Sequence, residues 1–201
     1  TMDLLVTLSR LYSDRRVRIM KRAKLGDLYC MKVPNGYKLY QWAYHIPKCG
    51  NYIRVFPHLY NEIPDNLEEI VDSEHSYIVG FAAGKAYRKK LASLLGNFPV
   101  PEKYPFPEYM LGFNFVGTKI RVLTSIGARP LCDYVDDIDE LPAEYRDVKQ
   151  LNSSFTPDWL MYLFDVDFDL SDWRKIWPRD EINKYIELFD KMMEEAEKNS
   201  N

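Results

Sequence analysis

Residues 26–46 read GDLYCMKVPNGYKLYQWAYHI, and this stretch decides the fold. It contains two runs rich in aromatic and aliphatic residues, 26–33 and 37–46, which are typical of β-strands. The tripeptide PNG separates them, and its Gly36 can take the positive φ that a tight turn needs. The stretch therefore predicts a β-hairpin.

The same pattern continues on the C-terminal side of this hairpin. Further strand-like runs occupy residues 52–60, 77–83, 110–116 and 119–125. They are separated by turn signals or, at residues 63–73, by a turn or short helix. Short strands joined by tight turns indicate a small barrel or a strongly bent sheet. We therefore expect an α+β fold that is mostly antiparallel β-structure, with flanking N-terminal and C-terminal helices.

Two segments in the middle of the chain depart from this pattern. Residues 86–97 place Leu91, Leu94 and Leu95 on one helical face and end in Gly96-Asn97, which predicts a short helix. Residues 98–109 contain four prolines and cannot continue that helix. This segment is either a domain linker or a strap packed on the sheet, and its aromatic residues favour the strap.

The expected organisation has three parts. Residues 1–25 form a basic N-terminal helical extension, residues 26–170 form the β-rich domain, and residues 171–201 form an amphipathic helix packed on it. Charge is distributed unevenly along them, although the net charge is only −3. Residues 1–25 carry seven Lys/Arg against two Asp, whereas residues 133–201 carry nineteen acidic against eight basic residues. A chain polarised in this way can steer a charged partner.

Signatures of catalysis and of cofactor binding are scarce. The histidines and cysteines lack metal-ligand spacing, and there is no phosphate-binding glycine loop, so we expect no cofactor. The best catalytic candidate is FDVDFDLSDW, in which Asp165, Asp167 and Asp169 would point the same way on a strand. Such a trio could serve a metal-dependent hydrolase. It fits a half-buried strand with a solvated acidic face equally well.

A nucleic-acid-binding module is a second alternative, because the N-terminal arm is rich in cations that could contact phosphates: Arg15, Arg16, Arg18, Lys21, Arg22 and Lys24. The sequence pI of about 5.7 is below the range typical of nucleic-acid-binding domains and argues against a nucleic-acid partner. No apolar run is long enough to span a membrane, and the N-terminal apolar stretch precedes its charges, the reverse of a secretory signal. We therefore expect a cytoplasmic location and no membrane partner.

Several short motifs resemble the bacterial immunity protein 26 family. They comprise Gly26-Asp27 followed by Leu28-Tyr29, the NG turn, an aromatic-rich second strand, and a later strand ending in Val79-Gly80. A Pro-rich segment and a strand follow, and then DELP at 139–142 precedes Trp159-Leu160. The resemblance spans roughly residues 24–165. The basic first 25 residues and the long acidic C-terminal helix depart from the family pattern.

This resemblance implies a mostly β, SH3-like core and no catalytic residues. It also implies a role in a polymorphic toxin system, in which the protein binds and neutralises a cognate toxin in the cell that makes it. A non-catalytic binding protein agrees with the scarcity of catalytic signatures. Because many toxin domains are basic nucleases, we expect an acidic surface to bind the partner. The candidate partner-binding residues are Asp133, Tyr134, Asp136, Asp137, Asp139, Glu140, Trp159 and Tyr162.

Overall fold

The computed structural model describes residues 22–114, 118–176, 187, 190–191 and 194. Within these residues an eight-stranded open sheet has the order β5-β1-β2-β3-β4-β8-β6-β7. Its strands are β1 (Asp27–Val33), β2 (Gly36–Ile46), β3 (Gly50–Val55), β4 (Tyr77–Gly80), β5 (Ser93–Asn97), β6 (Tyr109–Phe113), β7 (Ile120–Thr124) and β8 (Gln150–Ser154). All pairings are antiparallel except those of β8, which runs parallel to β4 and β6. The helical elements are α2 (Leu67–Asp72), α3 (Ala83–Arg88), α4 (Pro157–Asp165) and the 3₁₀ helices η1 (Ile138–Glu140), η2 (Ala143–Tyr145) and η3 (Leu170–Ile176).

This arrangement confirms the predicted α+β class and the largely antiparallel sheet. The sheet does not close, however, because β5 and β7 remain at its two ends. The structure is therefore an open, mixed sheet and differs from the closed SH3-like barrel that the resemblance implies. The difference arises at β8, which joins the β1–β4 meander to the β6–β7 pair through parallel contacts.

The predicted opening hairpin forms as β1 and β2, whose register pairs Tyr29 with Tyr40 and Val33 with Gly36. The GD motif at its start has a structural role. Gly26 has a φ of 87°, and a Cβ at this position would lie 2.5 Å from the Phe98 carbonyl oxygen, so only glycine fits. The buried Asp27 carboxylate accepts hydrogen bonds from Lys24 N, the Tyr29 hydroxyl and the Asn97 side-chain amide. Together they tie β1 to the edge strand β5.

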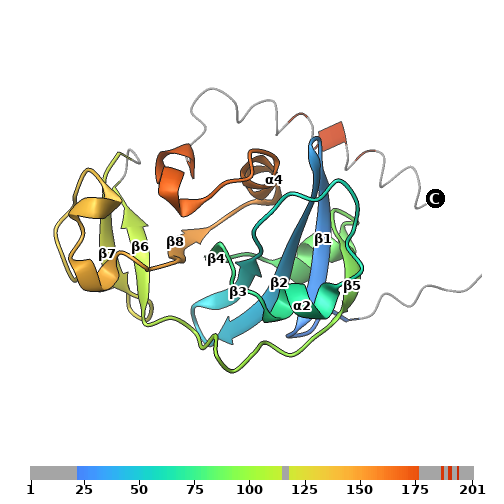
Figure 1. The fold of residues 1–201 in the computed structure, drawn as a ribbon, viewed down its shortest axis with the longest axis horizontal. Helices are drawn as coiled ribbons and strands as arrows, with labels where there is room; N and C mark the ends of the chain where they lie inside the picture. Colours follow the sequence, from blue (N-terminus) through green and yellow to red (C-terminus); the bar gives the residue numbers. More distant parts are fainter. Residues whose placement is uncertain (1–21, 115–117, 177–186, 188–189, 192–193, 195–201) are drawn as a thin grey trace, which may run out of the picture.

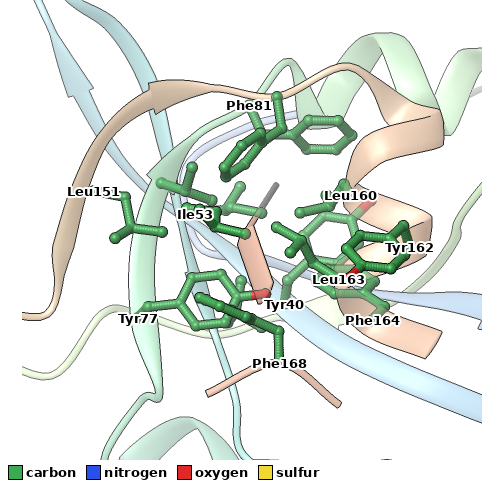
Figure 2. Close-up of a cluster of buried hydrophobic side chains, with 14 of the residues drawn as sticks. Tyr40, Ile53, Tyr77, Phe81, Leu151, Leu160, Tyr162, Leu163, Phe164 and Phe168 are labelled. Atoms are coloured by element: carbon green, nitrogen blue, oxygen red, sulfur yellow. The ribbon is translucent and has the colours of Figure 1, made fainter. Parts of the chain in front are cut away.

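The larger part of the core lies on the sheet face covered by α3, α4 and η3. Alternate residues of β1–β4 point to this face, because side chains along a strand alternate between its two sides. Figure 2 shows Tyr40, Ile53 and Tyr77 of the sheet facing Leu160, Leu163 and Phe164 of α4. These side chains are all fully buried. Their burial is the main force that holds α4 on the sheet.

The opposite face is covered by α2 and by the Pro-rich segment 98–108, which we call the strap (Figure 1). The Phe106 ring packs edge-on against Tyr44 and Tyr52, with ring centroids 5.3 and 5.1 Å away. The Tyr44 hydroxyl donates a 2.8 Å hydrogen bond to the Tyr104 carbonyl oxygen. The segment is therefore a packed strap, as its aromatic content predicted, and its residues are part of the fold.

The predicted helix at 86–97 is wrong in its position. The helix α3 ends at Arg88, and residues 93–97 form β5, which pairs with β1. Local leucine spacing suggested a helix, but pairing with the free edge of β1 satisfies more backbone groups than one extra helical turn would.

The outer parts of the three-part organisation lie mostly outside the described residues. Of the N-terminal extension only residues 22–25 are described, and they lead directly into the turn before β1. At the other end, residues 171–176 belong to η3, and the isolated helical residues Glu187, Asp190, Lys191 and Glu194 are exposed. Among the helices described, none is long and apolar enough to cross a membrane.

Candidate protein-binding surface

The acidic segment predicted to bind a partner lies beside the edge of the sheet. After β7 the chain turns at residues 125–129 and returns along β7, with isolated bridges joining Leu123 to Pro130 and Ile120 to Val135. Backbone hydrogen bonds from Leu131 N to Val122 O and between Ile120 and Val135 hold this return segment in place. We call residues 120–140, which include η1, the edge hairpin.

Two of the five carboxylates predicted to bind a partner already form ion pairs within the protein. Asp136 pairs with Lys119 at 3.1 Å, and Asp137 pairs with Arg174 of η3, also at 3.1 Å. The hydrogen bond from Arg174 holds the pKa of the Asp137 carboxyl below its usual value. Asp137 also accepts a hydrogen bond from the Ile138 N–H and so caps η1. Both residues therefore shape the hairpin as well as charging its surface.

The remaining carboxylates of the set, Asp133, Asp139 and Glu140, are exposed and form no ion pair within the part of the chain that the structure describes.

The same hairpin carries Ile126 and Leu131, which are 67% and 40% exposed. These belong to a group of only four large hydrophobic residues that stand out as exposed among the described residues. Sequence reasoning missed both, although an apolar residue beside a turn glycine is a signal that could have found Ile126. The hairpin therefore carries exposed apolar and acidic side chains, and binding surfaces commonly combine apolar with polar groups.

The predicted aromatic anchors are less accessible than expected. The Tyr134 ring lies under the Arg121 guanidinium, 4.3 Å from its centroid, and its hydroxyl donates to Phe113 O. Tyr162 is only 5% exposed, and its hydroxyl donates to Lys175 O, so the prediction that it is a surface anchor is wrong. Trp159 is half-buried, with its indole N–H donating to Ile176 O at 2.8 Å. The reason is tertiary: Trp159 and Tyr162 hold η3 against α4.

A cleft of about 460 Å³ adjoins the edge hairpin at Ile138. Its other walls come from the turn before β4, the start of β8 and the start of η3, including His75, Lys149 and Leu170. Lys149 pairs with Glu74 at 2.5 Å and lowers the pKa of that carboxyl. The cleft gives the hairpin a concave neighbour that could receive a partner side chain.

The alternative metal site is not assembled as predicted. Residues 157–165 form the helix α4, with Pro157 in its first turn and a buried run from Leu160 to Asp165. Asp165 accepts a hydrogen bond from Asn35 N at 2.8 Å, whereas Asp167 has a φ of 46° and pairs with Lys38. Asp169 is exposed and accepts from Ser171 N. The three carboxylates do not share a strand face, and no group of three possible metal ligands occurs among the described residues.

Sequence reasoning also missed a buried cationic site on the strap face. The Arg54 side chain is fully buried and donates hydrogen bonds to Gln41, Val71 O, Ser73 O and His75 Nδ1. The Tyr104 ring of the strap covers its guanidinium at 4.4 Å. Burial, together with the charge of Arg54, lowers the pKa of His75 to about 4. No local signal joins these residues, because the sheet brings them together from separate strands and turns.

Comparisons of the chain with protein-family models, with curated proteins and with solved structures found no match.

Proposed function

We propose that this protein is a non-catalytic binding protein that neutralises a cognate bacterial toxin by direct contact, in the cytoplasm of the cell that makes the toxin. The single observation that carries the proposal is the composition of the edge hairpin. Exposed apolar side chains, Ile126 and Leu131, share it with the exposed carboxylates of Asp133, Asp139 and Glu140. The motif resemblance at Gly26-Asp27 and DELP supports the toxin as the kind of partner.

The chemistry of this surface defines what the partner must offer. Apolar anchors at the centre of an interface contribute most of the affinity, whereas rim charges mainly raise the association rate. We assign the anchoring role to Ile126 and Leu131 and the steering role to the free carboxylates. The expected partner therefore presents an apolar depression surrounded by Lys and Arg. A basic nuclease domain has this charge pattern.

The experiment that tests the function combines capture with rescue. The tagged protein is used to capture partners from a lysate of the source organism, and each captured polypeptide is expressed alone in a sensitive host. We expect one polypeptide that arrests growth, with growth restored by co-expression of this chain. If captured polypeptides are harmless, or if co-expression does not restore growth, the proposal is wrong.

Two sets of variants test whether the edge hairpin is the surface that binds the toxin. We expect I126S/L131S to weaken binding of the captured toxin at least about a hundredfold, because hot-spot truncations typically cost 2 kcal/mol or more. The matched control is L25S/I63S, which removes the two other exposed large apolar side chains of the described residues, 50% and 40% exposed, and should bind normally.

The charge variant D133N/D139N/E140Q should slow association and flatten its salt dependence, with little change in dissociation rate. The control E62Q/D65N/E102Q removes three exposed carboxylates outside the hairpin. Stopped-flow measurements of the association rate at increasing salt compare the charge variant with this control. Equal rates for both variants would exclude the hairpin as the steering surface.

A further inference from the structure

A second charged surface lies where the N-terminal arm meets α3. The arm residues Arg22 and Lys24 are exposed, and so are Lys85, Arg88 and Lys89 of α3 and its C-terminal flank. Lys85, Arg88 and Lys89 are spaced at i, i+3 and i+4, which places them on one side of the helix. Sixty residues separate the two groups in the sequence, and so no local pattern predicts that they meet.

The contact between them is made by two small residues. A Cβ placed on Gly84 would lie 2.8 Å from Ala23 Cβ and 3.7 Å from Nη1 of Arg88. The α3 backbone therefore passes directly against Ala23, with the Arg88 side chain folded beside it. Arg22 and Lys24 flank Ala23 in the chain. The fold thus joins the two basic groups into one surface, which we call the arm–α3 surface.

Acidic residues do not neutralise this surface within the described parts of the chain. Arg22, Lys24, Lys85, Arg88 and Lys89 form none of the ion pairs found there. Asp27 lies close in sequence, but it is buried and its oxygens accept hydrogen bonds from Lys24 N, Tyr29 and Asn97. The first turn of α3 carries no acidic residue. These exposed cations therefore have no acidic ion-pair partner among the residues that the structure describes.

We propose that the arm–α3 surface binds the phosphate backbone of nucleic acid. Exposed Lys and Arg that neutralise phosphates release condensed counterions, and this supplies affinity without base-specific contacts. The acidic composition of the whole chain argued against such a partner, but the local charge of a surface governs phosphate binding. Among the described residues, Leu25 is the exposed large apolar side chain next to these cations, and it is 50% exposed. That is too little apolar area for insertion into a lipid bilayer. This inference is independent of the toxin-binding proposal.

The test is fluorescence anisotropy with a labelled 24-base-pair DNA duplex of random sequence, titrated with the full-length protein at increasing salt. We expect binding at 50 mM salt and a plot of log K against log salt with a slope steeper than about −3, since each phosphate contact contributes roughly −0.9. The variant K85Q/R88Q/K89Q should bind at least about tenfold more weakly, with the slope reduced by about 2 to 3 units. The variant R22Q/K24Q should reduce the slope by about 1 to 2 units.

The matched control is K32Q/K48Q/R129Q, which also removes two Lys and one Arg, all exposed and outside the arm–α3 surface. It should bind the duplex as tightly as the wild type. Circular dichroism confirms that each variant is folded. Equal binding by the α3 variant and the control would overturn the proposal. Binding to phosphatidylserine vesicles without binding to the duplex would overturn it too, and would assign the surface to a membrane.

Discussion

At the scale of single residues, the buried pair of Arg54 and His75 has a consequence for acid stability. His75 Nδ1 accepts a hydrogen bond from Arg54 Nε and must therefore be deprotonated at this nitrogen. Protonation would place a second positive charge beside a guanidinium that is already buried. Glu74, Lys149 and the Tyr104 ring also lie around His75, and only Glu74 favours its charged form. The neutral imidazole is thus required by the fold.

We predict that His75 makes the protein less stable as the pH falls from about 6.5 to about 4. The pKa of His75 is about 4 in the folded state against an ordinary value of 6.5, so the unfolded state binds more protons in this window. The loss in free energy of unfolding should reach up to about 3 kcal/mol. Urea denaturation at a series of pH values measures it.

His75→Gln keeps an acceptor for Arg54 and cannot titrate. Between pH 5 and 6.5, above the range in which most carboxylates titrate, its free energy of unfolding should change less with pH than that of the wild type. If the free energy of unfolding changes equally with pH in the two proteins, His75 is not the group that causes this pH dependence.

At the scale of elements, the loop that ends α4 anchors the opening hairpin. Asp165 accepts hydrogen bonds from Asn35 in the turn between β1 and β2, and Asp167 pairs with Lys38 of β2. The Lys38 side chain is 1% exposed, and burial lowers its pKa despite the pairing with Asp167. Two of the three carboxylates that suggested a metal site, Asp165 and Asp167, therefore hold the hairpin against the helix.

We predict that Asp167→Asn lowers the free energy of unfolding by roughly 2–4 kcal/mol, because it leaves a buried ammonium group without its counter-ion. Asparagine tolerates the positive φ at this position, so backbone strain does not add to the loss. Asp147→Asn is the control: it removes an exposed carboxylate that forms no ion pair among the described residues, and it should stay within about 0.5 kcal/mol of the wild type. Urea unfolding of both variants decides the matter, and equal stabilities would show that Lys38 does not depend on Asp167.

The strap is a second element with a testable role. Phe106→Ala removes the ring that packs between Tyr44 and Tyr52 and should lower the free energy of unfolding by about 2–3 kcal/mol. The strap should then open locally, and limited proteolysis should cut within residues 98–108 faster than in the wild type. Glu102→Ala, an exposed change in the same strap, should leave the cleavage rate unchanged. Cleavage at the wild-type rate in the Phe106 variant would show that the ring does not hold the strap.

At the scale of the whole molecule, the two ends of the sheet present opposite charges. The edge hairpin contains β7, at one end of the strand order, and the arm leads into β1 beside the edge strand β5 at the other end. Among the described residues, carboxylates without an ion pair lie on the edge hairpin and cations without one lie on the arm–α3 surface. A molecule polarised in this way can bind an acidic and a basic partner at separate places. The two proposals can therefore be tested with independent variants on one protein.

The sequence alone determined those features that depend on neighbouring residues. The hairpin at 26–46, the strands predicted at 110–116 and 119–125, and the packed strap follow from alternating side chains, turn residues and aromatic content. The structure confirms them over the residues that it describes, with β6 at Tyr109–Phe113 and β7 at Ile120–Thr124. The polarised charge also follows from the sequence. The sequence also indicated that the acidic residues at 133–140 lie largely at the surface, because charged side chains are costly to bury.

Only the tertiary structure decided where segments distant in the sequence meet. Residues 93–97 became a strand because β1 offered a free edge, and residues 157–165 became a helix because the sheet offered an apolar face. The parallel strand β8 joined the β1–β4 meander to the β6–β7 pair in one open sheet, which no local pattern could specify. Long-range packing likewise placed Arg54 beside His75, Asp167 beside Lys38 and Ala23 beside Gly84. The energy of such contacts depends on burial and on partners far along the chain, and neither can be read from a short window of sequence.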